Sequence, residues 1–287
     1  MPSLPISPSH LKFLGTLVPA VAVPLIYVLH LKRRFNLLTT TCAVVGSPDT
    51  VVLANAGGAG RNVARGVGDP ETRDREILPA EVRDAPQHWI VARESVVSRH
   101  VPATDLNPQF LCPEGNGDGD GERGKAFHGM VEAYISRSMR LFNHTPQAWF
   151  MRRAITDHEA RETFDAEYLD QCRFEVGDRV CGVYVVSSRT RHAGGETVIL
   201  SLSPPGGWTG PVVQGNLVVG YEREDREAVG YGIRITNETV LWRRKSEKPV
   251  FLEAALGRWL HAFMVQWMVV KGVEELTNGN GVKSKVS

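Results

Sequence analysis

The sequence predicts an α+β protein that has an N-terminal membrane helix followed by one domain, in which an antiparallel sheet wraps a central helix. Three observations support this prediction. Residues 13–31 form an uncharged run, residues 126–142 carry apolar side chains at the spacing of a helix, and several segments rich in Val, Ile and Tyr follow residue 180. A helix, a series of strands and a final helix in this order are typical of an antiparallel sheet with helices packed on it.

The uncharged run FLGTLVPAVAVPLIYVLHL, residues 13–31, is long enough to span a bilayer. A helix of this length covers roughly 28 Å at about 1.5 Å per residue, close to the hydrocarbon thickness. The basic triplet 32–34 follows directly, which predicts a single-pass anchor with the rest of the chain in the cytosol. A cleaved signal peptide and a buried soluble helix are the competing interpretations, and Pro19 and Pro24 also allow a hairpin that dips into one leaflet.

The charge balance gives no sign of nucleic-acid binding. The chain has 33 Lys and Arg against 32 Asp and Glu, a formal net charge of +1. Its four cysteines contain no CxxC pair, so they predict neither a zinc site nor a disulfide framework, in agreement with a reducing compartment. We therefore expect no metal and no cofactor. The expected partners are a membrane and a lipophilic small molecule, and a homodimer is left open.

The amino-acid composition along the chain divides it into five parts. They are an N-terminal tail over 1–12, the anchor over 13–31, a linker over 32–88, the α+β domain over 89–276 and a disordered tail over 277–287. The linker is rich in Gly, Pro, Ala and charged residues and has no sustained apolar period. Its Gly-rich residues 57–60 carry Val63 where a dinucleotide-binding fingerprint needs a small residue, so a flexible turn is expected there.

The spacing of apolar side chains assigns the elements of the domain. A first strand is expected over residues 90–101, and the central helix over 126–142 has a continuation over 147–155. The antiparallel strands are expected over 180–188, 197–202, 212–222 and 231–242. The last helix begins at Pro249, and its apolar stripe, which includes Trp259, is expected to pack in the core before it contacts a membrane.

Candidate catalytic residues lie on the polar face of the central helix. Side chains that recur every four residues form one line along it: His128, Glu132, Ser136 and Arg140. A histidine and a carboxylate one turn apart can hold each other's protonation state, as general acid–base catalysis requires. We therefore interpret His128 and Glu132 as an acid–base pair and Arg140 as an orienting group. The alternative is a solvent-facing line of ion pairs.

Two further candidates lie outside this helix. His144 follows the helix and is the alternative base, and Asp105 lies in the turn-like residues 102–107. An aspartate in such a segment either caps a turn or supplies a second carboxylate that orients the substrate. The chain has no GxSxG elbow, HExxH helix or Walker loop, so proteolysis, phosphoryl transfer and α/β-hydrolase chemistry lose their usual support.

Three stretches together resemble the hotdog fold of thioesterase-like proteins. They are residues 95–107 (SVVSRHVPATDLN), the helix over 127–142 and residues 164–189 (FDAEYLDQCRFEVGDRVCGVYVVSSR). The resemblance implies a sheet around the central helix and a catalytic role for Asp105, although residues 108–110 (PQF) replace the histidine–asparagine pair that the family commonly has there. A membrane-anchored group of thioesterase-like proteins shares the N-terminal span. The chain is also similar in texture to anchored proteins found beside fungal polyketide synthases.

Two functions follow from these patterns. The first is a membrane-anchored enzyme of secondary-metabolite biosynthesis that acts on a lipophilic acyl or polyketide-type substrate by thioester hydrolysis, dehydration, isomerisation or cyclisation. The second is a non-catalytic membrane adaptor or lipid-binding module. An enzyme should gather His128 and Glu132 with Asp105 or His144 at the mouth of an apolar cavity. A binding module should hold them apart or leave them in solvent.

Overall fold

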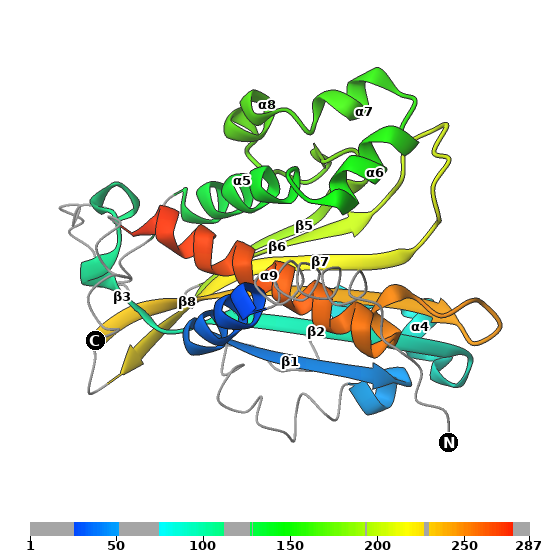
Figure 1. Ribbon diagram of the computed structural model, residues 1–287, viewed down its shortest axis with the longest axis horizontal. Helices are drawn as coiled ribbons and strands as arrows, with labels where there is room; N and C mark the ends of the chain where they lie inside the picture. The colour runs from blue at the N-terminus through cyan, green and yellow to red at the C-terminus, as the bar shows by residue number, and fades with distance from the viewer. Residues whose placement is uncertain are drawn as a thin grey trace, which may run out of the picture.

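The computed structural model describes residues 26–51, 75–111, 127, 129–192, 194–226 and 230–277. The fold is α+β, with one antiparallel sheet and a C-terminal helix packed on it (Figure 1). The strands are β1 (Thr39–Gly46), β2 (Trp89–Ser98), β3 (Val101–Pro102), β4 (Arg179–Val180), β5 (Tyr184–His192), β6 (Gly195–Leu202), β7 (Gln214–Arg226) and β8 (Gly230–Arg244). The helices are α4 (Ala80–Asp84), α5 (Met130–Phe142), α6 (Pro146–Ala154), α7 (His158–Glu162), α8 (Ala166–Gln171) and α9 (Ala255–Leu276), and residues 26–38 are also helical.

The sheet has the strand order β1-β2-β8-β7-β6-β5-β4, and β3 pairs with β8. Strands β5 to β8 form the meander that the Val- and Ile-rich segments predicted, and β8 then pairs with β2. This closing pair joins segments far apart in the chain, with Val91 opposite Trp242. The first half of the domain is thereby fixed to the second.

The two faces of the sheet carry separate cores, because successive side chains of a strand point to opposite faces. On β8, Ile233 and Ile235 belong to the core under α5 and α9, whereas Val240 and Trp242 belong to a smaller core on the other face. The smaller core also contains buried residues from outside the sheet: Val51, Ile77, Leu78 and Val82. Both long helices therefore lie on one face, as Figure 1 shows.

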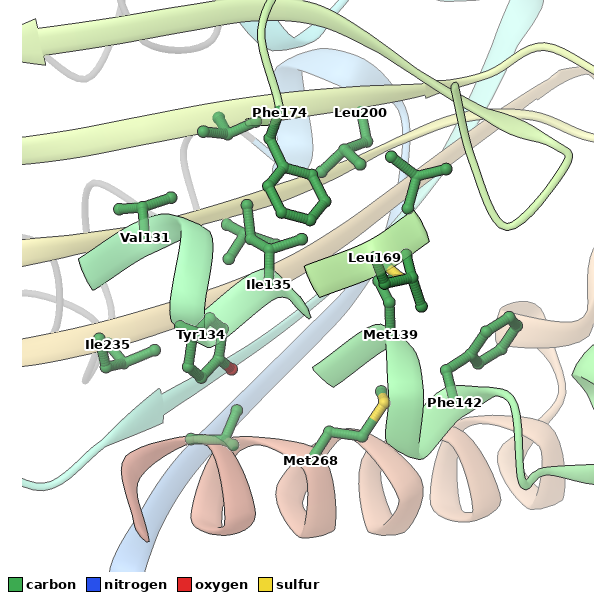
Figure 2. Close-up of a cluster of buried hydrophobic side chains, with 14 of the residues drawn as sticks. Val131, Tyr134, Ile135, Met139, Phe142, Leu169, Phe174, Leu200, Ile235 and Met268 are labelled. Atoms are coloured by element: carbon green, nitrogen blue, oxygen red, sulfur yellow. The ribbon is translucent and has the colours of Figure 1, made fainter. Parts of the chain in front are cut away.

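Helix α5 supplies the centre of the larger core. Its buried apolar residues follow the three- and four-residue spacing that predicted a helix over 126–142, and the structure has the helix over Met130–Phe142. Figure 2 shows Tyr134, Ile135 and Met139 packed among side chains of the sheet and of the other helices, with Met268 of α9 below them.

The sheet begins earlier in the chain than the sequence predicted. Strand β1, over Thr39–Gly46, lies in the segment interpreted as a linker, and it pairs along its whole length with β2. As the edge strand of the sheet it leaves most of its side chains exposed or half-buried. A half-exposed edge strand carries little apolar periodicity, which is why the pattern of residues 32–88 did not reveal it.

The start of the chain is described only from Ile26. Residues 1–25, with most of the expected anchor, lie outside the described residues, as do 278–287. Residues 26–31 are the first turns of the helix over 26–38, which lies against α9 (Figure 1). None of the helices within the described ranges combines the length and the hydropathy of a membrane span.

Candidate functional site

The structure describes four of the five residues that the sequence singled out, and His128 lies outside the described residues. Glu132, in the first turn of α5, is held by arginines of β5. Its Oε1 accepts a hydrogen bond from Arg189, and Arg191 Nη2 lies 3.7 Å from the same oxygen. Arg189 is buried and also reaches Glu196 Oε1 at 2.7 Å. Glu132 therefore helps to neutralise a buried cation.

Electrostatic interactions stabilise the charged form of Arg189 in this cluster of arginines and glutamates. Burial disfavours the charge on Arg189, but hydrogen bonds to Glu132 and Glu196 outweigh that cost and raise its pKa. Glu196, only 4% exposed, also accepts from Arg191 Nε at 2.7 Å. Glu132 Oε1 is thus engaged by arginine, whereas its Oε2 is buried and has no hydrogen-bond partner among the described residues. The alternative interpretation of a line of ion pairs therefore fits Glu132, with the pairs half-buried rather than exposed.

Arg140, one helical turn after Ser136, faces helix α8 instead. Ser136 Oγ donates to Asp170 Oδ1 at 2.9 Å, and Arg140 Nη1 donates to Asp170 Oδ2 at 3.2 Å. The four-residue spacing thus brings two side chains of α5 to one carboxylate. Their contacts fix α8 against α5.

The remaining two candidates lie elsewhere. His144 is exposed just after the end of α5. Asp105 lies in a 3₁₀ turn beside the last residues of α9, where the backbone N–H of Asn107 donates to the carbonyl of Leu276 at 2.9 Å. Its own close polar neighbour is Thr104, whose Oγ1 lies 3.4 Å from Oδ1. No contact among the described residues joins Asp105, Glu132, Arg140 and His144 into one site.

The structure reveals two part-buried histidine–carboxylate pairs that the sequence did not indicate. His261 Nδ1 of α9 lies 2.7 Å from Glu94 Oε1 of β2, and His100 Nδ1 lies 3.3 Å from Glu224 Oε2 of β7. The partners are 167 and 124 positions apart. Such separations leave no local spacing to find, because the packing of α9 on β2 and the pairing of β3 with β8 and of β8 with β7 bring these segments together.

The Glu94–His261 pair lies between the sheet and α9. The Glu94 side chain is 2% exposed and the His261 side chain 12%. Glu94 Oε2 is buried and has no hydrogen-bond partner among the described residues. Lys32 of the helix over 26–38 is close enough for its charge to act on Glu94; burial lowers the Lys32 pKa, and the carboxylate of Glu94 opposes that effect.

Gln266 forms a polar junction beside this pair. Lys32 Nζ donates to Gln266 Oε1 at 2.5 Å, and Gln266 Nε2 lies 3.0 Å from oxygens of Asn36, Thr39 and Thr41. Gln266 is 1% exposed. These bonds tie α9 to the helix over 26–38 and to β1, so the N-terminal helix is fixed in place by polar contacts as well as by packing.

Both helices also carry exposed large apolar side chains, which we together call the apolar surface: Ile26, Tyr27, Leu29, Leu256, Trp259 and Leu260. The ring of Phe263 lies between the two helices, 5.5 Å from that of Phe35 and stacked 6.1 Å from that of Trp259. The expectation that Trp259 is a core residue was wrong, because 37% of it is exposed.

A hollow of about 560 Å³ lies between α4 and the start of β2. Its lining includes Asp84, His88, Trp89 and Arg244, and Arg244 lies over the Trp89 ring at 5.4 Å. None of the sequence candidates lines it. Within the described ranges, no three His, Cys, Asp or Glu side chains gather closely enough to hold a metal ion.

Comparisons with known protein families, with curated proteins and with solved structures give no match for this chain.

Proposed function

We propose that this protein is a membrane-surface module, held on a bilayer by the uncharged residues 13–31 and by the apolar surface of the helix over 26–38 and α9. The observation that carries this proposal is the position of that surface. The uncharged run continues without interruption into Ile26, and Ile26, Tyr27 and Leu29 are exposed. The hotdog-like relationship stays a prediction and carries no part of the proposal.

The composition of the surface suits the interfacial layer of a membrane. Leu256, Trp259 and Leu260 recur at three and four residues, so they share one side of α9. Side chains of this kind enter the boundary between head groups and acyl chains, where tryptophan is favoured. Each large apolar side chain that leaves water gains about 1.5–3 kcal/mol if it is fully buried, so a patch of this size gives useful binding.

Charges beside the surface add to this attraction. Arg33 and Arg34 are exposed on the helix that carries Tyr27 and Leu29. Basic side chains near an anionic leaflet contribute about 1 kcal/mol each. The acid–base pair expected on α5 stays a prediction, because His128 lies outside the described residues.

An environment-sensitive fluorophore tests the proposal on the full chain. We would attach it to a cysteine introduced as Leu260→Cys, in a protein with Cys42 and Cys112 replaced by Ser, and reconstitute the protein into phosphatidylcholine vesicles with and without phosphatidylserine. Phe150→Cys on α6 is the matched control, because Phe150 is also exposed, at 64%.

Blue-shifted emission at position 260 in vesicles, with no shift at position 150, is the expected result. An emission at 260 that stays water-like in vesicles would overturn the proposal. A blue shift that instead depends on protein concentration in detergent, without vesicles, would assign the surface to a second copy of this chain.

A further inference from the structure

The Glu94–His261 pair has the geometry of an acid–base site. Glu94 Oε1 lies 2.7 Å from His261 Nδ1. A carboxylate there accepts the Nδ1–H, which fixes the tautomer with the lone pair on Nε2. Nε2 makes no hydrogen bond to the described residues, and the His261 side chain keeps 12% of its surface exposed. The nitrogen left available is the one that a general base needs.

The burial of Glu94 gives a second, independent observation. Its Oε2 is shielded from solvent and unpartnered among the described residues, in a side chain that is 2% exposed. Leaving a buried acceptor unpaired costs about 1–3 kcal/mol, and more when it is charged. A pair whose only role is to connect α9 with β2 would not require an unpaired oxygen. A carboxylate in a low-dielectric environment, however, stabilises an adjacent imidazolium more strongly than a carboxylate in water does.

The His100–Glu224 pair differs from the Glu94–His261 pair in the accessibility of the histidine Nε2. His100 Nε2 is buried, and a β-carbon placed on Gly232 would come within 2.7 Å of it. His100 is therefore enclosed on the side that a substrate would have to approach. It serves as the natural comparison for His261.

The position of His261 indicates what it meets. Leu260, its neighbour on α9, belongs to the exposed apolar surface, and Glu94 lies beneath the helix. If that surface enters a bilayer, as proposed above, the carbonyl groups at this depth are the acyl esters of lipids. The substrate class thus rests on the proposed function, whereas the acid–base pair itself does not.

We propose that His261 is a general base, positioned by Glu94, which hydrolyses acyl esters of lipophilic molecules. His261 Nε2 removes a proton from water as the water oxygen bonds to the acyl carbonyl carbon. The bond from that carbon to the alkoxy oxygen then breaks, and the imidazolium returns the proton to the leaving oxygen. One ester and one water give one acid and one alcohol, so the step needs no other reactant.

The test uses the full chain in phosphatidylcholine vesicles that contain p-nitrophenyl laurate. His261→Asn is the main variant, because the asparagine amide can still donate to Glu94 in place of Nδ1 but lacks the base. We expect its hydrolysis rate to fall by at least about 100-fold. Glu94→Gln should lower kcat and leave KM within about twofold, as for a positioning residue. The matched control His100→Asn should keep the wild-type rate.

Chemical modification gives a readout that does not depend on the folding of a variant. Carbethoxylation of the wild-type protein, followed by peptide mass spectrometry, should show activity lost in proportion to modification at His261. Exposed His144 and His158 should react without loss. Wild-type hydrolysis within a few-fold of His261→Asn, or activity that survives complete modification of His261, would overturn the proposal. Flotation of the same vesicles reports membrane binding separately, so failure of the acid–base site and failure of membrane association are distinguishable.

Discussion

Gly272 of α9 lies directly against the ring of Tyr134 of α5. A β-carbon at position 272 would stand 2.4 Å from Tyr134 Cε2 and 2.6 Å from Cδ2. Tyr134 is 1% exposed, and burial raises the pKa of its phenol to about 12. The absence of a side chain at Gly272 is thus what allows the two long helices to approach each other over the sheet.

We expect Gly272→Ala to lower the free energy of unfolding by about 1–3 kcal/mol, because the methyl group has to push the buried ring or the helix aside. Urea unfolding measures the change. Gly206→Ala is the control, since a β-carbon there meets no atom within 4 Å, and it should change stability by less than about 0.5 kcal/mol. Equal effects of the two substitutions would contradict the close approach of α5 and α9.

The second prediction concerns Arg189, and it tests whether Glu132 serves as a counter-charge or as a proton acceptor. Replacing Arg189 by Met removes the buried cation that Glu132 and the buried Glu196 share and leaves them only the exposed Arg191, so we expect a loss of about 3–5 kcal/mol in the free energy of unfolding. Arg140→Met removes a pair with Asp170 in which the side chains are 30% and 49% exposed, and it should cost less than about 1 kcal/mol.

Thermal and urea unfolding of both variants measure the difference. If Arg189→Met were as stable as Arg140→Met, Glu132 would not be needed as a counter-charge and could again be considered a proton acceptor. The structure leads us to expect the opposite.

The long regular elements of this fold could be predicted from the sequence, because each has enough apolar residues to show its period. The helix over Met130–Phe142, the strands β6 to β8 and the helix over Ala255–Leu276 were all expected near their observed bounds. Strand β1 was not. Its side chains are mostly exposed or half-buried, and what places it is its backbone pairing with β2, which apolar periodicity does not encode.

Much less of the candidate site could be predicted, and for a different reason. Spacing by four correctly indicates that Ser136 and Arg140 share a side of α5, but it says nothing about the partner, Asp170 of α8, that both side chains bind. Similarly, the pairing of Glu94 with His261 depends on how α9 crosses β2. Contacts of this kind arise from tertiary packing and have no signature in a local window.

From the Arg243–Glu253 pair we predict how the free energy of unfolding changes as the pH falls. The two side chains are joined at 2.6 and 2.7 Å, which ties β8 to the 3₁₀ turn over Phe251–Glu253 before α9. The hydrogen bonds from Arg243, assisted by the backbone N–H of Val250, hold the pKa of Glu253 below its usual value of 4.5, against the opposing effect of burial. The folded state therefore binds this proton less readily than the unfolded state does.

The sign of the effect follows from that difference. The stabilisation is fully present above the unfolded pKa near 4.5, and it is lost as pH falls through the folded pKa. We expect the free energy of unfolding of wild-type protein to decline more steeply in this acid range than that of Glu253→Gln. Arg243→Met should give the same shallower profile. Parallel profiles for wild type and Glu253→Gln would show that the pair does not stabilise the fold.

The last prediction concerns where the membrane segment ends and the folded domain begins. With an anchor over 13–31 and a linker over 32–88, as the sequence predicts, residues 1–34 could be removed without loss of any part of the domain. In the structure, however, Lys32 bonds Gln266 of α9, and the helix that carries Lys32 also places the Phe35 ring against Phe263. Removal of residues 1–34 thus cuts into the fold.

We expect a chain that lacks residues 1–25 to keep the melting temperature of the full chain and to bind vesicles more weakly, with the remaining binding reduced by salt because Arg33 and Arg34 are exposed. A chain that lacks residues 1–34 should melt several degrees lower, since it loses the packing of most of the helix over 26–38. Lys32→Met in the full chain measures how much of that loss belongs to the one hydrogen bond with Gln266. Identical melting temperatures for the two truncations would show that the helix contributes nothing to the fold, and its apolar residues would then belong to the anchor alone.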